Sequence, residues 1–218
     1  MADCDFTELD TAIYLAEYKN ASNILEKNKG LYYSKSKDKV LINFDSGLLN
    51  HFAKDYQKSN ESLSVAEKEI ENNFTKSVTQ KIGQAFINDN VANYVGEVYE
   101  DIYTNIFMCL NYIHLDLFDD AMVEIRRFNN KLQTIGSKYQ GVIASQKNML
   151  ANDYKCYDTS FDQKINFYNS AFARYMSMLL YRTDNDLDNA RVDYNKLIES
   201  FQMQRKIYNL DIPQSVHE

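Results

Sequence analysis

Large apolar side chains recur every three or four positions between residues 94 and 132, a spacing that fits helices and excludes strands. The first half of this segment is apolar around most of its circumference, and the second half has a narrower apolar stripe. Asp116, Asp119 and Asp120 form an acidic turn between the halves, and acids suit the start of a helix. We therefore predict a helical hairpin whose first helix needs further neighbours to cover it.

The rest of the chain has the same helical character. Its 218 residues include one proline and six glycines, too few for the turns of an all-β or α/β protein. We expect the hairpin's second helix to continue to about residue 150 and Gly30 to cap the first helix of the chain. Further helices are predicted at 8–29, 40–52, 56–74, 77–86, 164–181 and 187–203. The prediction is an all-α fold, one domain over 1–210 with a flexible tail over 211–218.

The charge and the rare residue types exclude several functions. The net charge of −7 argues against nucleic acid and anionic lipid surfaces as partners. No apolar run reaches the roughly 20 residues that cross a bilayer. The three histidines are scattered without an HExxH motif, so we predict no metal, no cofactor and no catalytic residue. Cys4, close to the start, is a candidate for the lipidated cysteine of a bacterial lipoprotein, and an incidental surface thiol is the alternative.

Four predicted turns share one pattern, a bulky apolar third residue and a small sixth residue. In a helical hairpin, the bulky residue would fill the turn and the small residue would let the second helix approach the first closely. The four segments are AEYKNA at 16–21, KDYQKS at 54–59, DLFDDA at 116–121 and NDLDNA at 185–190.

This pattern resembles the G-D-Y-x-x-A turn of the tetratricopeptide repeat. Gly47 and Cys109 match the family's small residue in the first helix, and Tyr112 and Tyr181 match its tyrosine. The small turn residues lie 38, 62 and 69 positions apart, against about 34 in a regular array. The resemblance therefore implies a helical-hairpin array, an α-solenoid, with degenerate repeats or inserted helices at about 70–95 and 134–163.

Longer stretches are similar to a group of uncharacterised bacterial envelope proteins with tetratricopeptide-like folds, many of them lipoproteins. The similarity lies in FDSGLLNHFAKDYQKSNESLSVAE, in INDN–Y–GEVYED and in AMVEIRR. It implies a place in the bacterial cell envelope or periplasm, with Cys4 as the anchor. A cytoplasmic location is the alternative.

The family resemblance also implies a peptide-binding groove lined by the first helices of the hairpins. We expect a non-enzymatic adaptor that binds a peptide or helix of a partner protein there. The groove would alternatively hold an apolar small molecule or lipid, or inserted helices would fill it and make its residues core. The predicted contact residues are Phe44, Leu48, Tyr99, Tyr103, Phe107, Leu110, Tyr175 and Arg182.

A polar set around the central hairpin is the other candidate site. Paired carboxylates beside an arginine can perform acid–base chemistry, but ion pairs between helices are commoner, and we favour that structural role. The set comprises Asn88, Asp89, Glu97, Glu100, Arg126 and Arg127.

Overall fold

The structure is a computed structural model that describes residues 6–33, 37–83, 94, 96–150, 169–203 and 212–216. Within these ranges every regular element is a helix, which confirms the all-α prediction. The chain divides into two compact units, residues 1–124 and 125–218, and each is described by itself. One continuous domain over 1–210 and a flexible tail stay predictions.

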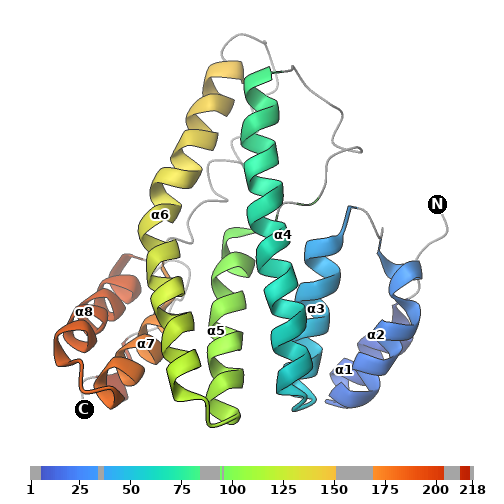
Figure 1. Cartoon of the computed structure of the whole chain (residues 1–218), viewed down its shortest axis with the longest axis horizontal. Helices are drawn as coiled ribbons and strands as arrows, with labels where there is room; N and C mark the ends of the chain where they lie inside the picture. Colours follow the sequence, from blue (N-terminus) through green and yellow to red (C-terminus); the bar gives the residue numbers. More distant parts are fainter. Residues whose placement is uncertain are drawn as a thin grey trace. The chain divides into compact units, whose positions relative to one another are not determined.

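Unit 1 consists of helices that pack in chain order (Figure 1). Each helix from α1 to α4 contacts the next one, and α3 also contacts α5. Its helices are α1 (Thr7–Tyr14), α2 (Tyr18–Tyr32), α3 (Lys39–Phe52), α4 (Tyr56–Gly83), α5 (Val98–His114) and the first residues of α6 (Phe118–Leu150). Unit 2 contains the rest of α6, then α7 (Ala171–Thr183), α8 (Leu187–Met203) and a 3-10 turn, Gln214–Val216. Helices α7 and α8 pack together as a hairpin.

Several predicted helix boundaries are corrected by the structure. The segment 8–29 is two helices joined by a turn, and Gly30 lies inside α2 rather than capping it. Helix α2 ends at Tyr32 because Tyr32 and Tyr33 turn back onto Phe6, with the Phe6 and Tyr32 rings stacked 4.5 Å apart. Helix α7 begins only after Ser170, whose hydroxyl accepts a hydrogen bond from the Ala173 amide as an N-cap.

The long gaps between the predicted repeats are partly filled by longer second helices. Helix α4 runs on to Gly83 and α6 to Leu150, so the separate helix expected at 77–86 continues α4 as far as the structure describes it. Inserted helices are therefore absent from 70–83 and 134–150. The remaining parts of both gaps, 84–93 and 151–163, lie outside the described residues.

The four predicted turns adopt one backbone conformation. In each, a residue other than glycine has a positive φ, and the next amide donates to a carbonyl of the preceding helix. These residues are Ala16 (57°), Lys54 (64°), Asp116 (58°) and Asn185 (60°). They occupy the position that holds glycine in the tetratricopeptide turn, and the left-handed conformation costs free energy for any residue with a Cβ.

Replacing Ala16 with glycine is therefore expected to stabilise unit 1. The gain in the free energy of unfolding should be about 0.5–1 kcal/mol, since glycine adopts this φ without steric penalty but loses more freedom on folding. Asn185→Gly is the control and should change stability less, because asparagine tolerates the left-handed region. Thermal unfolding followed by circular dichroism measures both, and an Ala16→Gly variant with a lower Tm would contradict the expectation.

The small residues of the repeat pattern are buried as predicted. Ala21, Ser59, Ala121 and Ala190 all lie in the interior, between 0% and 7% exposed. Gly47 shows how close the helices are, because a Cβ added there would lie 2.6 Å from Cγ and Cδ2 of Leu63 on α4. The predicted role of the bulky residues is wrong for Leu187, which is 61% exposed and fills no turn.

Candidate functional site

The first helices of unit 1 carry a partly exposed aromatic surface. We define this aromatic surface as Leu48 and Phe52 on α3 with Tyr99, Tyr103 and Phe107 on α5. Phe52 and Tyr99 are each 46% exposed, whereas the other three are partly buried against an apolar cluster. That cluster consists of Phe44, Leu63, Ala66 and Met108.

The remaining predicted groove residues differ in burial. Phe44 is 6% exposed and belongs to the core, so its burial favours the alternative that it is a core residue rather than a groove residue. Leu110 is half-buried on α5. Tyr175 and Arg182 belong to unit 2, where Tyr175 is half-buried and Arg182 is exposed on α7.

His51 lies at the edge of the aromatic surface, near the turn after α3. Its ring centroid is 5.0 Å from that of Phe107 and 5.2 Å from that of Phe52. The rings of Tyr56 and His114 lie 5.9 and 6.3 Å away and stack on each other at 4.5 Å. Three helices thus contribute rings around this histidine.

A buried chain of hydrogen bonds fixes one side of the His51 ring. His51 Nδ1 lies 2.6 Å from Oδ1 of Asn111, a fully buried residue of α5. The Asn111 amide nitrogen donates to Ser59 Oγ and to Asn60 Oδ1, both at 2.8 Å. Ser59 Oγ in turn donates to the Gly47 carbonyl at 2.7 Å. The chain therefore ties the second helix of one hairpin to the first helix of the next.

The predicted polar set has structural contacts at the start of α5. Glu100 is 3% exposed and accepts hydrogen bonds from the Glu97 amide and the Tyr94 hydroxyl, both at 2.7 Å. The first contact caps the helix. Burial raises the pKa of Glu100 and outweighs these two hydrogen bonds, which lower it. Glu97 itself is exposed.

The arginines of the polar set belong to unit 2, where Arg126 pairs with Asp184 at 3.9 Å on the surface. Arg127 is exposed. Asn88, Asp89 and Cys4 lie outside the described residues. The structural role that we favour for this set stays a prediction, and none of these contacts favours the alternative of acid–base chemistry.

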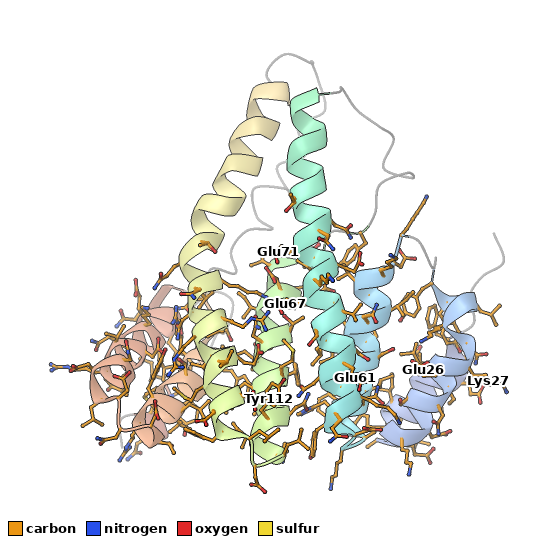
Figure 2. All side chains as sticks on the ribbon, in the orientation of Figure 1. Glu26, Lys27, Glu61, Glu67, Glu71 and Tyr112 are labelled. Atoms are coloured by element: carbon orange, nitrogen blue, oxygen red, sulfur yellow. The ribbon has the colours of Figure 1, made fainter. Side chains whose placement is uncertain are left out.

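Sequence reasoning missed a polar bridge that recurs in both units. Each bridge joins a buried polar side chain on a first helix to an acidic side chain on the second helix of the same hairpin. The polar residue lies sixteen positions before the small turn residue, and the acid lies three positions after it. Asn105 donates to Glu124 Oε2 at 2.6 Å in unit 1, and Arg174 pairs with Asp193 Oδ1 at 2.7 Å in unit 2. Asn105 also donates to Glu67, and Arg174 also donates to Asn129. Both acceptors lie eight positions after the small residue of the previous turn, which is Ser59 for Glu67 and Ala121 for Asn129. Figure 2 labels Glu67, which reaches from α4 to Asn105 of α5.

The bridge in unit 2 is a buried ion pair with a full set of partners. The Arg174 and Asp193 side chains are 5% and 3% exposed. Arg174 Nε donates to Asn169 Oδ1 at 2.8 Å, and the guanidinium lies 5.3 Å from the ring centroid of Phe128. Ser177 Oγ donates to Asp193 Oδ2. These contacts compensate the cost of removing both charges from water.

Two hollows open at the turn ends of unit 1, and the larger one includes Phe52 of the aromatic surface. The larger, about 550 Å³, is lined by residues 16–20, 23 and 52–54. The other, about 390 Å³, is lined by residues 19, 22, 23, 50, 53–58 and 115. Both are open to solvent, and lysine and asparagine side chains border them.

No helix in the described part of the chain is long and apolar enough to cross a membrane. Among the same residues, His, Cys, Asp and Glu side chains do not gather in threes that could hold a metal ion. Comparison with known proteins finds no matching family model, no similar curated protein and no similar solved structure.

Proposed function

We propose that this chain is a tetratricopeptide-like adaptor that binds a segment of a partner protein at the aromatic surface, without catalysing a reaction. Support for the repeat comes from the four turns of one conformation, the buried small residues and the polar bridge at equivalent positions. Stacked hairpins of this kind bury a continuous core and leave first helices to bind ligands.

The observation that carries the proposal is the exposure of aromatic side chains on the first helices. Phe52 and Tyr99 leave nearly half of their surfaces in water beside three partly buried apolar neighbours. Aromatic residues with this exposure are enriched at protein interfaces, where they bury large areas at low entropic cost.

A peptide is favoured over an apolar small molecule or lipid by the shape of the surface. A small apolar ligand needs an enclosed site that covers most of its surface. Both hollows described above are open to solvent rather than enclosed, so neither would cover most of the surface of such a ligand. An extended or helical segment would instead lie along the first helices.

Site-specific photo-crosslinking tests the proposal. A benzophenone amino acid at position 99 is expected to capture one defined protein from native extract, and excess unmodified protein should suppress the adduct. Positions 65 and 123 are matched controls, because Val65 and Val123 are 44% and 47% exposed on second helices. Adducts of equal yield from all three positions, or none from position 99, would contradict the proposal.

We place the adaptor in the bacterial cell envelope with Cys4 as a lipid anchor, on the sequence resemblance alone. Metabolic labelling with an alkyne fatty acid should mark the wild type but not a Cys4→Ser variant. Equal labelling of both would exclude Cys4 as the acylated residue.

A further inference from the structure

Hydrogen bonds beneath the aromatic surface determine which nitrogen of His51 carries the proton. The Ser59 hydroxyl is fully buried and donates its hydrogen to the Gly47 carbonyl, so its oxygen must accept from Asn111. This contact identifies the Asn111 atom facing Ser59 as the amide nitrogen and the atom facing His51 as the oxygen. Because a carbonyl oxygen only accepts, neutral His51 carries its hydrogen on Nδ1.

The other ring nitrogen, Nε2, is therefore a fixed hydrogen-bond acceptor. Burial lowers the pKa of His51 and outweighs the hydrogen bond to Asn111, which raises it, so the ring is neutral near pH 7. Among the described residues, Asn111 is the hydrogen-bond partner of His51. The imidazole that carries this acceptor is half-buried and contacts the rings of Phe52 and Phe107 at the edge of the aromatic surface.

Basic residues lie in and just after the turn that follows His51 in the sequence. Lys54, whose amide donates to the His51 carbonyl at 2.9 Å, is exposed in the turn that follows α3. Lys58 lies one turn further on, where it pairs with Asp55. The Lys54 ammonium would repel a cationic donor that came close to it, whereas an uncharged N–H or O–H donor would not be repelled.

We propose that the segment docking on the aromatic surface presents a tryptophan or tyrosine whose ring packs on Phe52 and Phe107 and whose hydrogen is donated to His51 Nε2. The inference rests on the proposed docking function and adds the chemistry of the partner's central residue. Buried polar groups discriminate strongly against ligands that leave them unpaired, so His51 would determine specificity.

Two matched probes test the inference on the unmodified protein. Indole carries the donor, and 1-methylindole has nearly the same ring without it. Titration of isotopically labelled protein, followed by amide and imidazole NMR signals, should show indole binding next to His51, Phe52 and Phe107. Its affinity should be about five-fold higher than that of 1-methylindole, the usual value of one neutral hydrogen bond.

Two variants assign this preference to the acceptor. His51→Phe keeps an aromatic ring and removes Nε2, so both probes should then bind with equal affinity. His114→Phe removes the neighbouring imidazole and should retain the preference for indole. If His51→Phe does not fold, the probe pair on the wild type decides alone.

Each other outcome overturns the inference in a recognisable way. Equal binding of both probes to the wild type removes the role of His51 and leaves the docking proposal standing. Tighter binding of benzylammonium than of indole replaces the neutral donor by a cation. Absence of binding by every probe rejects the site for aromatic donors, while crosslinking at position 99 independently judges the adaptor function.

Discussion

Replacing Asp193 with leucine should lower the free energy of unfolding of unit 2 by about 3–5 kcal/mol, because the Arg174 guanidinium would stay buried without its counter-charge. The pair is almost inaccessible to water, and its 2.7 Å separation indicates a strong, charge-assisted hydrogen bond. Urea unfolding followed by circular dichroism measures the loss. Hydrogen exchange of peptides from α7 and α8 assigns it to unit 2.

The surface pair of the same unit is a matched control. Arg126 and Asp184 are 59% and 43% exposed and lie 3.9 Å apart, so Asp184→Leu should cost no more than about 1 kcal/mol. An Arg174→Met/Asp193→Leu double variant should be more stable than the sum of the two single effects predicts, since it leaves no isolated charge. Equal losses in Asp193→Leu and Asp184→Leu would show that the buried pair has no special role.

Gly47→Ala should destabilise unit 1 by about 1–3 kcal/mol, although alanine is the better helix former. The new methyl group would meet Leu63 at its branched Cγ, not at the end of a flexible chain, and Leu63 is fully buried. Helices α3 and α4 would therefore have to move apart. Thermal and urea unfolding of the variant measure the loss.

The same substitution at Gly30 should have the opposite sign. Gly30 is exposed inside α2, so alanine there should stabilise by about 1 kcal/mol through helix propensity alone. Adding Leu63→Ala to Gly47→Ala should cost less than the two single losses together, because it removes the atoms that clash. A stabilising Gly47→Ala would refute the close approach of α3 and α4.

The helices and turns were predictable because they depend on local spacing. Apolar periodicity located α3 and α8 closely, and the small residues located all four turns. Helix α6 was harder, since it runs through Gly136 and Gly141, each of which costs only about 1 kcal/mol in a helix. Boundaries set by distant packing, such as Tyr32 on Phe6, leave no local signal.

The polar interior could not be read from apolar spacing. Asn105, Asn111 and Arg174 lie on buried faces where a count of apolar residues treats them as interruptions. Their positions relative to the small turn residues were nevertheless available in the sequence. Aligning the hairpins on Ala121 and Ala190 places Asn105 with Arg174 and Glu124 with Asp193. The aromatic surface was predictable in outline, but the free acceptor nitrogen of His51 depends on contacts from three separate segments.

The polar bridge restricts how this chain can be rearranged by recombination. An interface made only of aliphatic side chains accepts a transplanted hairpin of similar shape. Here a hairpin beginning with Arg174 needs an acid on its own second helix and a polar acceptor on the helix before it. The α3–α4 hairpin has Asn43 and Ser62 at the positions equivalent to Arg174 and Asp193. If it replaced the α7–α8 hairpin, the residues that contact Arg174 would have no matching partner. The order of the hairpins is thus specified by charge as well as by shape.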